Sequence, residues 1–173
     1  FVRARDHAAA LGLRLPGVWN TSGYEKAETV RALEGVVDIY LPDFKYWDGA
    51  AAAKYSSGAE DYPARAREAI LEMHRQVGVA KPGPDGIMRR GLMIRHLVMP
   101  NRTAGTAGIV RWIAGNLPKD TYLNIMSQYR PYYRAKEHDA IARRITRGEY
   151  SEVVRLAKEA GLTNLDIQGY PLF

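Results

Sequence analysis

Short apolar runs alternate along the chain with longer stripes of apolar residues, which is the pattern of strands alternating with helices. Four short runs are predicted to be buried strands, at residues 15–21, 36–44, 91–99 and 122–129. Apolar positions spaced three and four apart predict helices at residues 2–11, 25–34, 62–77, 106–116, 136–147 and 151–160. Residues 46–60 are expected to form a loop, and residues 166–173 a short extended tail.

Turn and capping residues support several of these boundaries. Asp61 and Pro63 suit the start of the helix at 62–77, and Gly78 follows its end. Pro42 lies inside the second predicted strand and has no backbone N–H, so regular pairing is expected to end near it.

The alternation of strands and helices predicts an α/β fold, in which right-handed βαβ units build a parallel sheet with flanking helices. Residues 1–173 are expected to form a single domain, because no repeat or low-complexity linker divides them. Four strands are too few to close a barrel, so the sheet is expected to have open edges.

Composition excludes several classes of protein. The 173 residues contain no cysteine, which excludes a disulfide scaffold and favours a reducing, cytoplasmic location. The chain has no apolar run of about 18 residues and no signal-peptide pattern at its start, so no membrane partner is expected. The net charge of +6 is spread along helices beside acidic residues, so no nucleic-acid partner is expected either.

Polar residues gather at the carboxyl ends of the four predicted strands, the edge at which α/β folds bind ligands. These ends offer amides, hydroxyls, one carboxylate and several cations, which together suit a small zwitterionic ligand. The segments concerned are Asn20-Thr21-Ser22-Gly23, Asp43-Phe44-Lys45, Arg95-His96 and Ser127-Gln128-Tyr129-Arg130.

Each of these groups also has a purely structural interpretation. Residues 20–23 are typical of a strand-to-helix turn with a capping hydroxyl. Asp43 and Lys45 could form a solvated pair, although alternation puts both on the same side of an extended segment. His96 lies in an apolar run and is more typical of a core histidine than of a catalyst. The tyrosines of residues 129–133 either pack against the sheet or form an aromatic wall of a pocket or partner groove.

Motifs for several common activities are missing. The four histidines share no spacing typical of a metal site. The sequence has no G-x-S-x-G elbow, no P-loop and no G-x-G-x-x-G motif. Hydrolase, NTPase and dehydrogenase activities therefore have no motif support.

Five segments together resemble the later part of a radical S-adenosylmethionine (SAM) protein, of the group similar to pyruvate formate-lyase activating enzyme. They are VWNTSGYE, VDIYLPDFKY, YSSGAEDYP, IRHLVMPN and NIMSQYRPYY, in this order along nearly the whole chain. The resemblance implies a partial TIM-type (β/α)6 radical SAM barrel, of which this chain holds strands three to six. It also implies a [4Fe–4S] cluster held by a Cys-x3-Cys-x2-Cys loop, and a Gly-Gly-Glu motif, neither of which is present here.

The resemblance further implies a SAM site at the rim of the barrel. Asp43 and Lys45 match the family's Asp-x-Lys motif, which contacts SAM, and Arg95 matches an arginine on the fifth barrel strand. Asn20 stands where an acidic residue is usual, and Tyr129 falls near a SAM-contacting histidine. No residue is expected to be catalytic or to bind a metal. The cofactor-binding residues implied are Asn20, Thr21, Asp43, Lys45, Arg95, Gln128 and Tyr129.

The chain begins at Phe1 inside a predicted helix, so the first hypothesis is the C-terminal part of a radical SAM oxidoreductase resembling an activase, inactive as this piece alone. In the intact family, reductive cleavage of SAM gives a 5′-deoxyadenosyl radical, which in activases abstracts hydrogen from a glycine of a partner enzyme. The resemblance thus implies a glycyl radical enzyme or another protein as partner, and flavodoxin or ferredoxin as electron donor. Two alternatives stay open: a natural cysteine-free member without radical chemistry, and an unrelated α/β binding or interaction domain.

Overall fold

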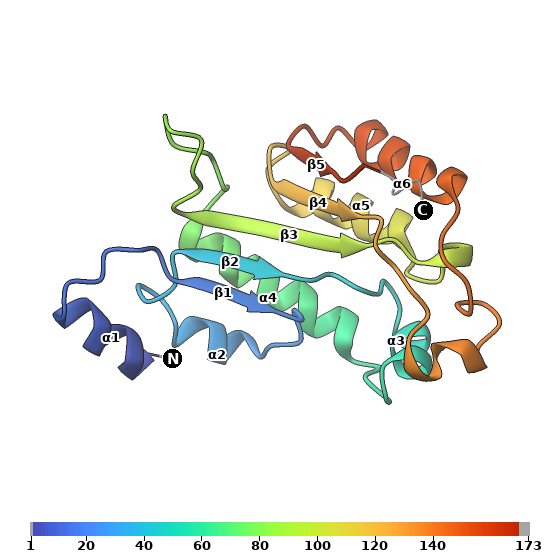
Figure 1. Ribbon diagram of the computed structural model, residues 1–173, viewed down its shortest axis with the longest axis horizontal. Helices are drawn as coiled ribbons and strands as arrows, with labels where there is room; N and C mark the ends of the chain where they lie inside the picture. The colour runs from blue at the N-terminus through green and yellow to red at the C-terminus, as the bar shows by residue number, and fades with distance from the viewer. Residues whose placement is uncertain (1, 170–173) are drawn as a thin grey trace.

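The computed structural model describes residues 2–169, which contain one five-stranded parallel sheet (Figure 1). The strands pair in sequence order, and each neighbouring pair is parallel. The predicted α/β fold, with four parallel strands adjacent in sequence order, is therefore confirmed. The four predicted strands are all shorter than expected, and a fifth is present. The strands are β1 (Val18–Thr21), β2 (Ile39–Pro42), β3 (Gly91–Leu97), β4 (Tyr122–Met126) and β5 (Leu165–Ile167).

The fifth strand lies in the segment that was expected to be an extended tail. Leu165 and Asp166 pair with Leu123 and Asn124 of β4. A strand of three residues carries too short an apolar run to be recognised in the sequence. The end of the expected tail, residues 170–173, lies outside the described residues.

Most helices lie where the apolar spacing predicts them, and two regions differ. The predicted helix at 136–147 is not formed: a short 3₁₀ helix ends at Glu137, and turns and irregular chain occupy residues 138–146. The expected loop at 46–60 contains α3, because Asp48 accepts a hydrogen bond from Ala51 N–H and caps an alanine-rich turn. The helices are α1 (Val2–Ala10), α2 (Ala27–Arg31), α3 (Gly49–Tyr55), α4 (Tyr62–Val77), α5 (Thr106–Asn116) and α6 (Arg147–Glu159), with 3₁₀ helices η1 (Pro100–Arg102) and η2 (Tyr133–Glu137).

Helix α6 begins at Arg147 rather than at residue 151 because a capping box precedes it. The Thr146 hydroxyl accepts the backbone N–H of Glu149 at 3.2 Å, and the Glu149 carboxylate accepts the N–H of Thr146 at 2.7 Å. Two otherwise unpaired amides are thereby satisfied at the helix start.

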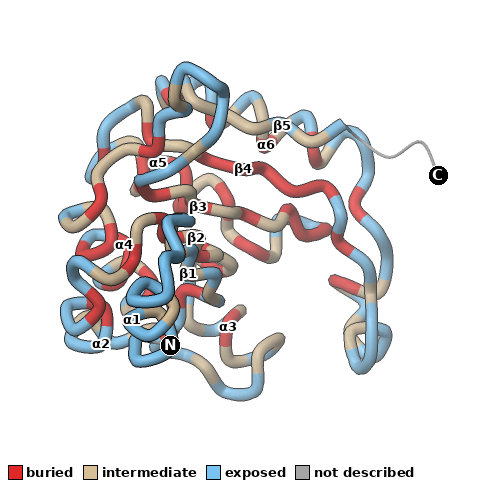
Figure 2. The backbone as a smooth tube through the Cα atoms, turned by 60° about the vertical axis from the view of Figure 1, so that its left-hand side comes forward, coloured by how far each residue is buried: buried red, intermediate tan, exposed pale blue. Residues whose placement is uncertain are grey.

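The two faces of the sheet differ in what covers them. Helices α2, α4, α5 and α6 contribute to one core against the sheet (Figures 1 and 2). Tyr40, Leu92, Ile94, Leu123 and Ile125 point into this core and are at most 1% exposed. The alternate strand positions, which include Arg95 and Asn124, point to the opposite side, called here the open face. No helix among residues 2–169 is long and apolar enough to cross a membrane.

Candidate functional site

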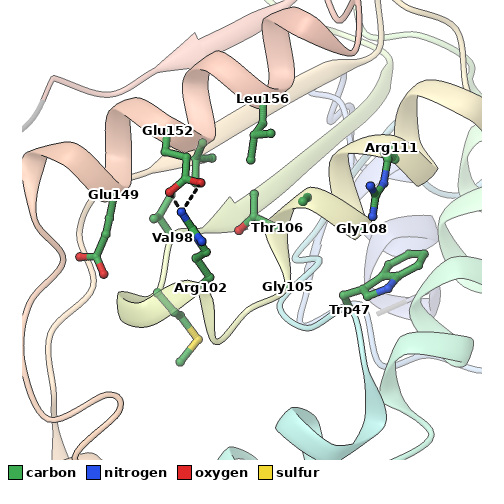
Figure 3. Close-up of a pocket in the computed structure, with 13 residues that line it drawn as sticks. Trp47, Val98, Arg102, Gly105, Thr106, Gly108, Arg111, Glu149, Glu152 and Leu156 are labelled. Carbon is green, nitrogen blue, oxygen red and sulfur yellow. Dashed lines mark hydrogen bonds and ion pairs between the residues drawn. The ribbon is translucent and has the colours of Figure 1, made fainter.

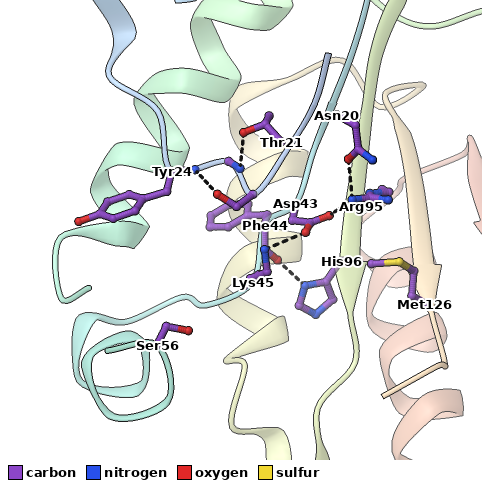
Figure 4. Close-up of polar contacts among 12 residues, drawn as sticks. Asn20, Thr21, Tyr24, Asp43, Phe44, Lys45, Ser56, Arg95, His96 and Met126 are labelled. Atoms are coloured by element: carbon purple, nitrogen blue, oxygen red, sulfur yellow. Dashed lines mark hydrogen bonds and ion pairs between the residues drawn. The ribbon is translucent and has the colours of Figure 1, made fainter. Parts of the chain in front are cut away.

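Four of the side chains predicted at the rim meet on the open face, at the carboxyl ends of β1, β2 and β3 (Figure 4). Arg95 Nη2 donates to Asn20 Oδ1 at 2.8 Å and lies 2.7 Å from Asp43 Oδ1. Lys45 Nζ donates to the other Asp43 oxygen at 2.8 Å. Asn20, Asp43, Lys45 and Arg95 form one connected network, called here the rim cluster. The prediction that Asp43 and Lys45 lie on the same side of the chain is confirmed.

The charges of the rim cluster are only partly paired. The contact from Arg95 to Asp43 Oδ1 is an ion pair whose angles do not make a hydrogen bond, so this buried carboxylate oxygen has no directed donor in the described part of the chain. Arg95 Nε is also buried and has no acceptor among residues 2–169. The Asp43 and Arg95 side chains are 16% and 26% exposed, and Lys45 is 33% exposed. The network thus combines one carboxylate with two cations, and leaves polar capacity unused beside the open face.

Tyr62, at the start of α4, holds the segment that carries Asp43. Its hydroxyl accepts the N–H of Lys45 at 2.9 Å, and carbonyl oxygens of Asp43 and Ser22 lie 2.9 and 3.0 Å from it. Burial raises the pKa of Tyr62 well above its ordinary value, so the hydroxyl stays protonated and can donate. Gly23 allows the two strand ends to approach: its φ is +79°, and a Cβ there would lie 2.2 Å from the Asp43 carbonyl oxygen.

Thr21 takes part in the turn after β1 rather than in the rim cluster. Its hydroxyl donates to Glu25 Oε1 at 2.6 Å and accepts the N–H of Gly23 at 3.2 Å. Both contacts stabilise the strand-to-helix turn, which agrees with the structural interpretation of residues 20–23.

The two candidates at the end of β4 point to different sides. Tyr129 is 8% exposed, belongs to the hydrophobic core, and donates its hydroxyl hydrogen to Ile141 O at 2.9 Å. Gln128 is exposed, and its amide nitrogen lies 3.5 Å from Met126 Sδ. The expectation that Tyr129 points to the same cavity as Asp43 is therefore not met, because its ring is buried in the core and its hydroxyl bonds to Ile141.

His96 is a satisfied core histidine, as its apolar surroundings predict. Nδ1 lies 2.7 Å from Phe44 O, and Nε2 lies 2.8 Å from Thr106 Oγ1. A carbonyl oxygen can only accept, so Nδ1 carries the hydrogen and Nε2 accepts from the Thr106 hydroxyl. Burial lowers the pKa of His96, which keeps the ring neutral.

A second polar group on the open face has no counterpart among the sequence-based candidates. Tyr122 Oη and Asn124 Nδ2 both donate to Asp166 Oδ2, at 2.8 and 2.6 Å. Burial and this hydrogen bond raise the pKa of Tyr122 to about 12. Tyr122, Asn124 and Asp166 are called here the Asp166 cluster. The alternation of β4 could have placed Asn124 opposite the core, but nothing in the sequence showed that Asp166 lies beside it.

A separate cavity of about 360 Å³ lies between α5, α6 and the segment after β2 (Figure 3). Arg102 reaches across it to Glu152 at 2.9 Å, and Trp47 packs against Gly105 and Gly108 at the start of α5. Arg111 lies near the other end of the cavity. None of the rim cluster lines it. Among residues 2–169, no group of three or more histidines and carboxylates could hold a metal ion.

The fold and the site together define an α/β domain that presents a charged polar cluster on the open face of a parallel sheet. The chain is similar to Uncharacterized protein MJ0674 of Methanocaldococcus jannaschii, with 34% identity over 153 residues. This match covers 88% of the chain and 40% of the relative, so the chain spans less than half the length of this curated relative. No family model and no solved structure matches the chain. The relative's name states no activity, so function has to be argued from the site.

Proposed function

We propose that this chain is part of a radical SAM enzyme similar to pyruvate formate-lyase activating enzyme, and that its rim cluster binds the amino-acid end of SAM. In the intact protein the sheet would belong to a partial (β/α)6 barrel. The observation that carries the proposal is the connection of Asn20, Arg95, Asp43 and Lys45 into one network at the strand ends. The family resemblance implies these residues as a SAM site, and they lie in or directly after three separate strands.

The chemistry of the rim cluster fits a zwitterion. Arg95 and Lys45 can bind a carboxylate, and Asp43 with Asn20 can accept from an ammonium group. Arg95 Nε and Asp43 Oδ1 make no hydrogen bond in the described chain, which favours a ligand that bonds to them and changes the contact between the two side chains. A bound zwitterion would exchange the two ion pairs of Asp43, with Arg95 and with Lys45, for ion pairs of these side chains with the ligand.

The residues of this chain do not fit an iron–sulfur cluster. Fe–S clusters are held by cysteine thiolates, and the 173 residues contain none. The proposal therefore assigns cluster binding to residues outside this chain, and assigns to this chain the positioning of SAM and the exclusion of water. In such enzymes the bound SAM supplies the radical that abstracts hydrogen. The substrate, the glycyl radical enzyme partner and the flavodoxin or ferredoxin donor belong to the proposal for the whole protein.

Calorimetric titration with SAM tests the assignment, using the whole protein and the variants Asp43→Ala and Lys45→Ala. Each variant should weaken SAM binding about 10- to 100-fold, because one charge-assisted hydrogen bond is worth about 1.5–3 kcal/mol. The iron–sulfur absorbance should stay unchanged. Lys54→Ala, which removes an exposed cation on α3 outside the rim cluster, serves as the matched control.

Normal SAM binding by both variants would refute this site. The 173-residue chain alone should bind SAM at millimolar concentration or not at all, and should release no 5′-deoxyadenosine with any reductant. Release of that product from the isolated chain would contradict the proposal that the cluster is bound by residues outside this chain. A whole protein without a Cys-x3-Cys-x2-Cys segment would instead favour the alternative, a cysteine-free α/β binding or interaction domain.

A further inference from the structure

The Asp166 cluster concentrates hydrogen-bond donors on a single carboxylate oxygen. Tyr122 and Asn124 both donate to Oδ2, at 2.8 and 2.6 Å, and both stand on β4 next to the edge strand β5. Register pairs Asn124 with Asp166 on one side and with Arg95 on the other. The cluster therefore continues the polar row that begins at the rim cluster, across the same open face.

The negative charge of Asp166 has no cationic partner within the described residues. Among residues 2–169 no lysine, arginine or histidine forms an ion pair with it, although the residue is only partly exposed. Arg95 is the cation closest in register, and its Nη2 already serves Asp43 and Asn20. Deeply buried carboxylates are normally paired with a cation, and Asp166 is shielded from water only in part. This carboxylate is held in place by two neutral donors instead, so its charge remains uncompensated.

The cluster offers acceptors in one place. A carboxylate has about four acceptor positions, and the two bonds to Oδ2 leave both positions on Oδ1. No described residue donates to Asn124 Oδ1 or to the Tyr122 oxygen. The Tyr122 hydrogen is already used. An ammonium group has three donors and no acceptor, and a guanidinium group has five donors. Either matches a set of acceptors on a carboxylate, an amide and a phenol.

We propose that the Asp166 cluster binds the ammonium or guanidinium group of an organic ligand. Strands lie about 4.8 Å apart, so the two strand steps from Arg95 to Asp166 place this subsite about 10 Å from the rim cluster. The binding itself does not depend on the proposed enzyme activity. Only one consequence rests on the proposed function: in that enzyme, the subsite would hold a cationic part of the substrate beside the SAM site.

Nuclear magnetic resonance of the side-chain amide of Asn124 tests the proposal directly, because this amide donates to the carboxylate in question. The protein is titrated with propylammonium chloride, with 1-propanol, and with sodium chloride at the same ionic strength. Propylammonium should shift the Asn124 signal saturably in the millimolar range. Propanol has a similar shape without the charge and should not, and sodium chloride should not. A saturable shift with all three probes, or with none, would overturn the proposal.

Two variants separate this subsite from other charges. Asp166→Asn keeps an acceptor for both donors but removes the charge, so it should weaken propylammonium binding at least tenfold. Asp120→Asn is the matched control, because Asp120 already pairs with Lys81 at 3.2 Å. Asp43→Asn should leave propylammonium binding intact while it impairs SAM binding, so the two proposals can fail separately. Equal binding by wild type and Asp166→Asn would refute the assignment, and the probe comparison on the wild type decides the matter if the variant does not fold.

Discussion

His96 makes the stability of this fold sensitive to mild acid. The ring is 1% exposed and is neutral in the folded protein, because burial lowers its pKa. In the unfolded chain a histidine titrates near pH 6.5. Below that pH the unfolded state therefore binds a proton that the folded state does not. The unfolding free energy should accordingly fall as the pH drops through 6.5, and should continue to fall until the folded-state pKa is reached.

The change in unfolding free energy depends on how many protons the unfolded state binds in excess of the folded state. One proton taken up only by the unfolded state changes the unfolding free energy by about 1.4 kcal/mol per pH unit. Between pH 7.5 and pH 5.5 the loss should thus approach about 1.4 kcal/mol. Three carboxylates have a pKa lowered to about 2, namely Glu72, Asp85 and Glu149. They add to the loss only below their ordinary pKa values, 4.5 for the glutamates and 3.8 for Asp85. Urea denaturation at pH 7.5, 6.5 and 5.5, followed by circular dichroism, measures the slope.

Two variants show whether the slope belongs to His96. In His96→Asn the amide can still donate to Phe44 O, but the bond to Thr106 is lost, so we expect about 1–3 kcal/mol less stability at pH 7.5. The slope between pH 7.5 and 5.5 should disappear. His138→Asn removes a half-exposed ring that packs edge-on against Tyr55 and should keep the slope. A flat profile in the wild type, or the same slope in His96→Asn, would refute the reasoning.

Two further predictions concern the strand ends and the sheet edge. Tyr62→Phe leaves the N–H of Lys45 without its acceptor and should lower the unfolding free energy by about 1–2 kcal/mol in urea titrations, whereas Tyr24→Phe, at an exposed position, should cost less. Among the described strands β1 pairs only with β2, so its outer edge is unpaired and the isolated chain should self-associate at high concentration. Light scattering should show this, and Val18→Lys should reduce it; a monomer at every concentration would argue against an available edge.

The sequence predicts helices and strands well where a segment has one apolar face and is bounded by turn residues. Helices α4 and α5 begin and end at the predicted residues, since each has a clear apolar stripe and Gly78 also ends α4. The predicted helix at 136–147 is wrong for an understandable reason. Ile141 and Ile145 are four residues apart and both buried, which imitates a helical stripe. They reach the core from irregular chain, and the capping box of Thr146 starts the helix only after them.

The candidate site likewise has a part that the sequence predicts and a part that it does not. Alternation places Asp43 and Lys45 on one side of an extended segment, and parallel pairing of neighbouring strands brings Arg95 beside them, so alternation and strand order suffice for these three residues. Tyr62 could not be found by such rules, because it lies 17 residues from Lys45 and reaches it from a helix. Asp166 could not be found either, because its neighbour Asn124 is 42 residues away and β5 is too short to recognise.

The contacts around Phe44 explain why the rim cluster can sit at the end of a strand that Pro42 terminates. The Phe44 N–H donates to Arg95 O at 2.8 Å, and its carbonyl oxygen accepts from His96 at 2.7 Å. The Phe44 ring is fully buried and meets Trp112 edge-on at 5.5 Å. Tyr62 holds the residues on either side. The backbone that carries the carboxylate and the lysine is therefore held by the core and not by strand pairing alone. A site whose backbone is held in this way loses little conformational freedom when a ligand binds. Such a preorganised site can distinguish ligands by their geometry.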